Sequence, residues 1–394
     1  MNTKGVVAIT AIVACVLTNT VRDILYVRNN GEFNSKVSKI ARILKDYSLY
    51  EADEDKMGDF AAAGMLLAVD DHYTNYYSKD DYESYKTNLS NSFMGVGIVL
   101  SIDPETEKLV VVSPIDGSGA AKAGILAGDF VLAVDGIYYL GDEMDAAVAA
   151  IRGADLEEKA GTKVVLTIER DGKEMDIEVE RGIVENDSVS EKMLDDSIGY
   201  VRITAFNSAD VEDETAKDTY DEFSESLNIL KEQGMKSLVL DLRGNPGGSL
   251  DVVIKIADEL LPYGIITYTE DKNGKRQDYT SNEGELGMPI AVLVDNSSAS
   301  ASEVLTGALK DFEKAKIVGE KTFGKGIVQT MFNLSDGSGL TVTTSKYYSP
   351  NGTCIHGIGI EPDVVVEMDS EKQISELTYD EDIQLQKAVE ILKK

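Results

Sequence analysis

The chain has 394 residues and a net charge of −32, from 38 basic and 70 acidic side chains. Apolar residues make up 43% and charged residues 27%, as is typical of globular proteins. This composition excludes wholesale disorder, collagen and a multi-span membrane protein. At roughly 150 residues per domain, the length predicts about two to three domains. The acidic charge repels phosphate backbones, so no nucleic-acid partner is expected.

The N-terminus predicts a segment directed to a membrane. Lys4 is followed by an apolar run over 5–17, and the next charge is Arg22. The run is short for a span of about 20 residues and resembles the core of a signal peptide. We therefore expect residues 1–28 to be a signal peptide or membrane anchor, and the rest to be exported, in a bacterial cell envelope. A lipid anchor at Cys15 and a buried helix are the alternatives.

Residues 29–90 are expected to be helical. Apolar residues such as Val37, Ile40 and Leu44 recur at helical spacing, and the tail over 377–392 has a similar pattern. Helices packed on their own domain are the expectation, and a contact in a homodimer is the alternative.

Residues 91–182 are expected to form a small β-rich module. Val96, Ile98 and Leu100 alternate along one predicted strand, as is typical of a strand with one buried face. Residues 109–111 and 164–168 continue this pattern, whereas 144–151 has helical spacing.

Residues 183–394 alternate between strand and helix, which indicates α/β layers with a mostly parallel, mixed sheet. The predicted strands are 199–203, 237–241 and 289–294, and the predicted helices are 220–233, 250–261 and 301–309. The whole chain is thus expected to be a multidomain protein of α+β and α/β class, with a helical N-terminal segment, a β-rich module and an α/β core.

A glycine-rich turn over 241–248 (DLRGNPGG) follows a predicted buried strand and precedes a helix. Such a turn aims main-chain N–H groups at an anion, so it fits either a plain tight turn or an oxyanion-binding turn. The Lys-Ser/Thr pair of a phosphate-binding P-loop is missing.

A serine-rich segment over 295–303 leads from a strand into a helix. Ser300 and Glu303 match a capping box, and a serine at a helix N-terminus is also placed to be a nucleophile.

In a third segment Lys325 stands between two glycines, and on a strand it would share a face with Gln329. Lys325 is either a solvated side chain or a desolvated general base.

A Ser-His-Asp site is the competing arrangement, and it would have to use His72 or His356. Neither stands beside an evident nucleophile or acidic partner. Two histidines also exclude a His-rich metal site, and two cysteines cannot form a disulfide framework, so no metal or other cofactor is expected.

The glycine-rich turn, the serine-rich segment and the segment around Lys325 follow one another in this order, and 335–363 comes after them. Together they resemble the carboxyl-terminal processing peptidases, or tail-specific proteases. The resemblance implies a serine–lysine peptidase with Ser300 as nucleophile, Lys325 as base and Gln329 as its helper. It places the oxyanion donors on the N–H groups of Ala301 and Gly247.

The β-rich module resembles a PDZ domain. Its peptide-binding loop would be formed by Phe93, Met94, Gly95, Val96, Gly97 and Ile98. Related enzymes use an arginine to link this domain to the active site, and Arg152 matches it, although residues 154–160 are inserted directly after.

The resemblance therefore implies an exported serine endopeptidase that binds the exposed C-terminal tails of proteins or peptides. A catalytically silent PDZ scaffold is the alternative. A homodimer, a regulatory partner, the physiological substrate and the choice between processive and single-site cleavage are left open by the sequence.

Overall fold

The computed structural model describes residues 31–89, 92–103, 106–115, 117–153, 160–185, 187–209, 216–282, 284–368, 374 and 377–394. The expected signal peptide or anchor over 1–28 lies outside these residues. Within the described part, no helix combines the length and apolar character needed to cross a bilayer. The chain divides into two compact units, one of residues 1–79 with 330–342 and one of residues 80–329 with 343–394.

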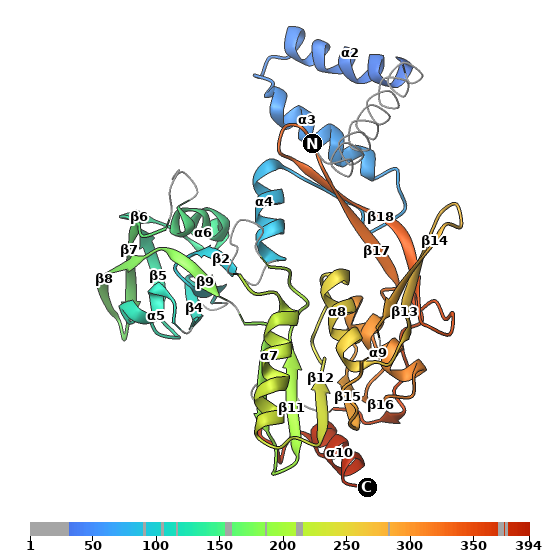
Figure 1. Cartoon of the computed structure of the whole chain (residues 1–394). Helices are drawn as coiled ribbons and strands as arrows, with labels where there is room; N and C mark the ends of the chain where they lie inside the picture. Colours follow the sequence, from blue (N-terminus) through green and yellow to red (C-terminus); the bar gives the residue numbers. More distant parts are fainter. Residues whose placement is uncertain are drawn as a thin grey trace, which may run out of the picture. The chain divides into compact units, whose positions relative to one another are not determined.

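In the part that the structure describes, the first unit carries the helices α2 (Gly31–Tyr47) and α3 (Glu54–Leu66) and a short strand, β1 (Asn75–Tyr77) (Figure 1). Asp53 caps α3 by accepting the main-chain N–H groups of Asp55 and Lys56. Strand β1 pairs with residues 339–341. Helices in the region predicted to be helical, 29–90, are confirmed, but residues 75–77 form a strand there, and the apolar face of α2 is exposed, not buried as predicted. Its apolar residues keep 40–50% of their surface exposed: Phe33, Val37, Ile40, Ile43 and Leu44.

The β-rich module of the second unit is an antiparallel sheet in the order β3-β4-β5-β7-β8. Its strands are β3 (Ile98–Ile102), β4 (Leu109–Pro114), β5 (Phe130–Val134), β7 (Lys163–Arg170) and β8 (Lys173–Glu180), with β6 (Ile137–Tyr138) beside β5. Two helices, α5 (Gly119–Ala123) and α6 (Met144–Arg152), and a separate pair, β2 (Ser92–Gly95) with β9 (Gly182–Glu185), complete it. Strand β3 therefore lies at an edge of the sheet.

The α/β core is a six-stranded sheet in which only the first pair is antiparallel, as predicted for a mixed sheet. In spatial order its strands are β10 (Val189–Met193), β11 (Ile198–Ile203), β12 (Ser237–Asp241), β15 (Ile290–Val294), β16 (Ala315–Gly319) and β19 (Val364–Val365). Three helices pack on one face: α7 (Thr219–Glu232), α8 (Leu250–Leu260) and α9 (Ala301–Asp311). The last helix, α10 (Ile383–Leu392), packs on the other face.

Alternation along the central strands produces these two layers. In β12, Leu238 and Leu240 pack with the three helices, whereas Val239 packs with α10. A second, antiparallel sheet was not predicted. It is formed by β13 (Gly264–Asp271), β14 (Arg276–Ser281), β17 (Ile327–Asn333) and β18 (Gly339–Tyr348), and β1 pairs with β18. Helix α4 (Lys79–Asn88) follows β1.

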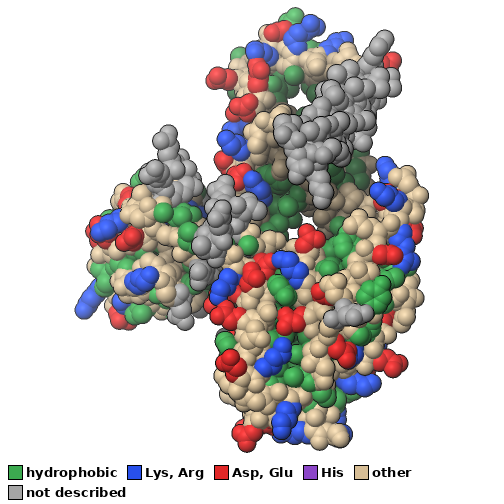
Figure 2. Space-filling view, in the orientation of Figure 1, with side chains coloured by type: hydrophobic (Ala, Val, Ile, Leu, Met, Phe, Trp, Pro, Cys, Tyr) green, Lys and Arg blue, Asp and Glu red, His purple; other side chains and the backbone are tan. Residues whose placement is uncertain are grey.

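The surface carries charges of both signs. On the face that Figure 2 shows, Lys and Arg side chains are scattered among Asp and Glu side chains. Exposed ion pairs of this kind contribute little to the free energy of unfolding, because solvent screens their charges.

Candidate active site

The serine-rich segment and the glycine-rich turn meet at one edge of the parallel sheet. They follow β15 and β12, which are neighbouring parallel strands, so both loops emerge on the same side. The carbonyl oxygen of Asn245 accepts the Ala299 N–H and the Ser302 hydroxyl, each at 3.0 Å. The Ser298 hydroxyl donates to the Leu242 carbonyl oxygen at 2.9 Å. These bonds fix the two loops to each other.

Ser300 has a backbone conformation that a non-glycine residue rarely adopts, with φ of 55° and ψ of −114°. Such a conformation costs about 1–3 kcal/mol and is concentrated at functional sites. It is held by the start of α9, where the Ser300 N–H donates to Oε2 of Glu303 at 3.0 Å and the Glu303 N–H donates to the Ser300 carbonyl oxygen. Ser300 is therefore both the N-cap of a helix and a half-buried side chain in a strained turn.

Glu303 is the residue whose importance the sequence did not reveal. Its side chain is 1% exposed and accepts four hydrogen bonds. Oε1 accepts the Thr322 hydroxyl at 2.6 Å and the Gly324 N–H at 2.8 Å. Oε2 accepts the N–H groups of Ser300 at 3.0 Å and Lys325 at 2.8 Å. One buried carboxylate thus positions the main chain of both candidate catalytic residues.

Lys325 lies in the loop before β17, not on the strand where its spacing with Gln329 suggested it. Burial lowers the pKa of the Lys325 amine below its ordinary value. This is the direction that a general base at neutral pH requires. Gln329 does lie on β17, and its amide nitrogen donates to the Thr343 hydroxyl at 3.4 Å.

Tyr347 is a second residue that the sequence did not single out. Its side chain is 4% exposed, and its hydroxyl donates to the Lys325 carbonyl oxygen at 2.5 Å. It also lies within hydrogen-bonding reach of the Ser300 side chain. Burial raises the pKa of Tyr347, so the phenol stays neutral and can act as a donor.

The glycine-rich turn packs directly against the serine. A Cβ atom on Gly247 would lie 2.7 Å from Ser300 Cβ and 2.9 Å from the Ala301 nitrogen, and φ of Gly247 is 106°. Only glycine fits there. The Gly247 N–H donates to Oδ1 of Asn245 at 2.8 Å, whereas the N–H groups of Gly248 and Ala301 have no partner within the described residues. Gly248 is therefore a further oxyanion-donor candidate beside the two that the resemblance implied.

The two histidines stay outside this site. His72 lies in an exposed turn before β1, not in a helix, and the His356 side chain is also exposed. Neither side chain hydrogen-bonds to Ser300 in the described part of the chain. The arrangement that the structure assembles around Ser300 involves Lys325, Glu303 and Tyr347.

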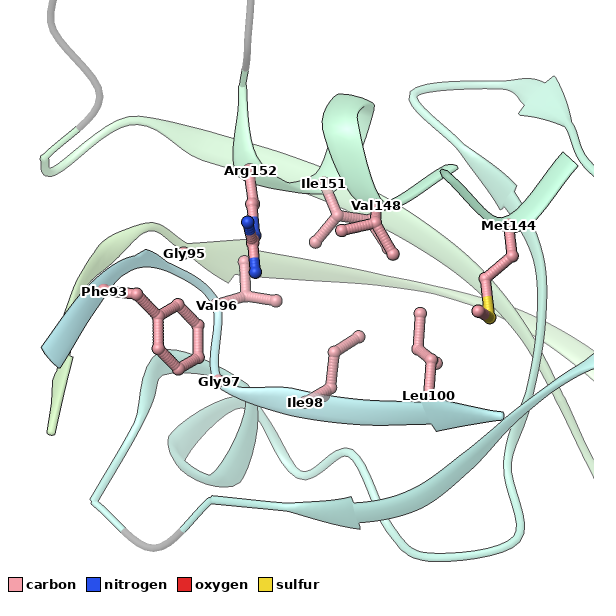
Figure 3. Close-up of a pocket in the computed structure, with 10 residues that line it drawn as sticks. All are labelled: Phe93, Gly95, Val96, Gly97, Ile98, Leu100, Met144, Val148, Ile151 and Arg152. Atoms are coloured by element: carbon pink, nitrogen blue, oxygen red, sulfur yellow. The ribbon is translucent and has the colours of Figure 1, made fainter. Parts of the chain in front are cut away.

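The PDZ-like loop lines a pocket between β3 and α6 (Figure 3). Ile98 and Leu100 point into it from the strand, and Val148 and Ile151 face them from the helix. The Arg152 guanidinium reaches toward the loop and lies 5.5 Å from the centre of the Phe93 ring. Met94 belongs to the predicted loop but does not line the pocket, and it pairs with Ile183.

The loop places donors at one end of this pocket. Gly97 has a φ of 77°, and a Cβ atom there would lie 2.2 Å from Ser118 Cβ, so the loop needs glycine. The N–H groups of Val96 and Gly97 have no acceptor among the residues that the structure describes. Burial lowers the pKa of Arg152, but an arginine stays charged near neutral pH. This end of the pocket is therefore suited to an anion.

Two parts of the chain match known protein families. The model of peptidase family S41 matches residues 197–366, and that of the PDZ domain matches residues 92–180. A carboxyl-terminal-processing protease of Synechocystis sp. is 37% identical over 335 residues, which are 83% of this chain and 75% of that protein. A carboxy-terminal-processing protease of Bartonella bacilliformis is 39% identical over 80% of this chain and 70% of its own length.

Among solved structures, the photosystem II D1 C-terminal processing protease is 30% identical, with 83% of this chain and 85% of that chain covered and a TM-score of 0.49. The family predicted from the sequence motifs is confirmed by the two relatives and by both domain models. This chain belongs to the S41 family of carboxyl-terminal processing proteases and is a serine-type peptidase with a PDZ domain.

Proposed function

We propose that this peptidase is an exported endopeptidase that binds the C-terminal tails of proteins through its PDZ domain and cleaves them with Ser300 and Lys325. The observation that carries the catalytic part is the shared acceptor of these two residues. Their main-chain N–H groups both donate to Oε2 of Glu303, at 3.0 and 2.8 Å. A strained serine and a desolvated lysine are thereby held on adjacent pieces of chain.

Acylation begins with proton transfer. The neutral amine of Lys325 takes the proton of the Ser300 hydroxyl while Oγ bonds to the carbonyl carbon of the scissile peptide. The N–H of Ala301 and a glycine N–H of the turn, from Gly247 or Gly248, stabilise the oxyanion that forms. The C–N bond then breaks, and the leaving amine takes the proton back from Lys325.

Deacylation uses the same groups in the same roles. A water molecule loses a proton to Lys325 and attacks the ester carbon, and the oxyanion is stabilised again. The ester bond breaks, Ser300 regains its proton, and a peptide with a new carboxylate leaves. Gln329, on β17, is proposed to orient the lysine amine without adding a charge that would raise its pKa.

Tail capture uses the donors of the PDZ loop. A terminal carboxylate would accept the N–H groups of Val96 and Gly97 and face the positive charge of Arg152. The preceding residues would add as a strand to the edge of β3, which has a strand neighbour on one side only in the described sheet. An unfolded tail is the class of substrate that can do so.

Export rests on the N-terminal sequence alone, where Lys4 precedes the apolar run over 5–17. Neither a homodimer nor a regulatory partner is part of the proposal. The alternative function is a PDZ scaffold without activity, and the arrangement of Ser300, Lys325 and Glu303 argues against it.

The test is proteolysis of an unfolded protein whose own C-terminus is either free or amidated. The wild-type chain should cut the free form, cut the amidated form more slowly, and lose activity on Ser300→Ala or Lys325→Ala substitution. Ser297→Ala is the matched control, because Ser297 is an exposed serine of the same loop. Cleavage by the Ser300→Ala variant would exclude Ser300 as nucleophile, and an inert wild-type chain that still binds free tails would favour the scaffold.

A further inference from the structure

Tyr347 contacts the loop that carries Lys325 at two successive carbonyl groups. Its hydroxyl donates to the Lys325 carbonyl oxygen at 2.5 Å, and its main-chain N–H donates to the Gly326 carbonyl oxygen at 3.2 Å. The Tyr347 side chain is buried in the apolar core that also contains α9. One residue of β18 thus holds the main chain on both sides of Gly326.

The composition of the loop makes this restraint necessary. Lys325 stands between Gly324 and Gly326, and glycine leaves the main chain free to adopt many conformations. Glu303 accepts the Lys325 N–H from α9 at 2.8 Å, and Tyr347 donates to the Lys325 carbonyl oxygen from β18. Buried side chains of two different elements therefore hold both polar groups of the Lys325 main chain.

Strand β18 gives the Tyr347 hydroxyl a fixed position. It pairs with β13, where Tyr347 lies opposite Thr269. The next side chain, Tyr348, points to the other face of the strand and stacks on Tyr268, with ring centres 4.9 Å apart. Burial raises the pKa of the Tyr347 phenol, so the hydroxyl keeps the proton that it donates.

We propose that Tyr347 is a positioning residue that keeps the Lys325 amine out of water and in place for proton transfer from Ser300. This inference rests on the proposed function and adds a residue on which the base depends. A displacement of the main chain would carry the lysine stem with it, and a misplacement of about 1 Å can cost about a hundredfold in rate.

The titratable groups around the loop define what its release would change. The Glu303 carboxylate faces it from α9 and the Tyr347 phenol from β18, whereas His356 packs on Gly326 through its main chain and has an exposed side chain. A released loop would let the Lys325 amine reach water, which favours its charged form. The pKa that burial lowers should then rise toward its ordinary value.

The experiment compares Tyr347→Phe with the wild-type full chain in steady-state peptide cleavage over a range of pH. Phe keeps the ring and removes only the hydroxyl. At neutral pH, kcat should fall about tenfold to a hundredfold while KM changes less than about twofold, because the base is displaced and the substrate contacts are kept. The rising limb of kcat/KM should move upward by about one pH unit, so that part of the activity returns in alkaline solution.

Tyr348→Phe is the matched control, since it removes a hydroxyl one residue away, on the opposite face of the same strand. It should leave kcat and the pH profile as in the wild type. Tyr347→Met is a second variant without the hydroxyl, and its flexible apolar side chain adapts to the vacated space. It should show the same displaced limb, and calorimetry establishes the temperatures at which each variant is folded.

The outcomes separate this inference from the proposed function. Wild-type kcat and pH profile in a folded Tyr347 variant would overturn the role of Tyr347. A fall in kcat with an unmoved limb would overturn it too, because the hydroxyl would then act elsewhere than on the lysine. Lys325→Met is assayed beside these variants: cleavage by it would overturn the proposed function, whereas its inactivity beside a wild-type-like Tyr347→Phe would overturn only this inference.

Discussion

Asp382 binds Arg243 through both of its carboxylate oxygens. Nη1 of Arg243 lies 2.8 Å from Oδ1 of Asp382, and Nη2 lies 2.8 Å from Oδ2. Burial alone would lower the pKa of Arg243, but Asp241 and Asp382 raise it. Asp382 is the N-cap of α10, and Arg243 begins the turn that carries Gly247. This ion pair therefore fastens the C-terminal helix to the glycine-rich turn.

The first prediction concerns Asp382→Asn. An amide nitrogen cannot accept a hydrogen bond, so one of the two bonds from Arg243 would be replaced by two opposed donors. Breaking a buried ion pair from one side costs about 3–5 kcal/mol, so the melting temperature should fall. The turn should also lose its fixed position, and kcat should fall more than KM rises.

Differential scanning calorimetry and steady-state peptide cleavage measure these two effects. Glu390→Gln on the same helix is the control, because its ion pairs with Lys387 and Lys394 are exposed and should change neither quantity. Wild-type melting temperature and kcat in the Asp382→Asn variant would contradict the role given to this ion pair.

The second prediction is that Glu303→Gln abolishes most of the activity. All four groups that bind the Glu303 carboxylate are hydrogen-bond donors. The amide nitrogen of the introduced glutamine is itself a donor, so it could not accept the bonds that one carboxylate oxygen accepts. Ser300 and Lys325 would then lose their common anchor, and kcat/KM should fall at least about a hundredfold, which corresponds to ~3 kcal/mol. The steady-state rate of peptide cleavage measures this fall in kcat/KM.

Glu313→Gln serves as the control for this variant, since Glu313 is an exposed residue just after the same helix. A Glu303→Gln enzyme that retained wild-type kcat/KM would show that the shared carboxylate does not position the two residues.

The layers of the core could be predicted because strong apolar periodicity marks each of their elements. Leu238 to Leu240 and Leu250 to Leu260 are apolar enough to identify a buried strand and a packed helix from the sequence. The antiparallel sheet was missed because some of its strands are mostly polar, as in Arg276–Ser281. Their pairing depends on contacts distant in sequence.

The candidate site was predictable only in part, for a related reason. Ser300 and Lys325 stand in local patterns of small residues, and those patterns are visible in the sequence. Glu303 looked like half of a capping box, because its bonds to Thr322 and Lys325 form only when a distant loop folds over α9. The position of Lys325 in a loop follows from the glycines on either side of it, which do not favour a strand.

The third prediction is that Lys325→Met removes activity but stabilises the fold at neutral pH. The pKa of Lys325 is lower in the folded chain than the value of about 10.4 in the unfolded chain. The folded chain therefore binds this proton less tightly, and protonation disfavours folding. The resulting loss in the free energy of unfolding has its full size at pH values below the folded-state pKa, and it disappears as the pH rises toward about 10.4.

Thermal melting against pH measures the difference between the two proteins. Lys325→Met should melt at a higher temperature than wild type at neutral pH, and the two curves should converge in alkaline solution. Wild-type kcat/KM should rise with pH, because only the neutral amine accepts the serine proton. Lys321→Met, on the same loop but exposed, should show neither effect. A Lys325→Met variant less stable than wild type at neutral pH would contradict the desolvated amine.

The last prediction concerns Arg152, which sequence resemblance links to communication with the active site and whose position suggests carboxylate binding. No acidic side chain pairs with it in the part of the chain that the structure describes, and its guanidinium lines the pocket beside the loop. A charge-assisted hydrogen bond contributes about 1.5–3 kcal/mol. Arg152→Met should therefore weaken binding of a free-ended peptide about tenfold or more and leave an amidated peptide unchanged.

The comparison of the two peptides distinguishes lost charge from a damaged pocket. Met keeps the apolar stem of the side chain but removes the guanidinium that lies over the Phe93 ring. Lys173→Met, an exposed substitution on β8 of the same domain, should bind both peptides as wild type does. An equal loss for the free and amidated peptides would mean that Arg152 shapes the pocket, and no loss would mean that Val96 and Gly97 bind the carboxylate without it.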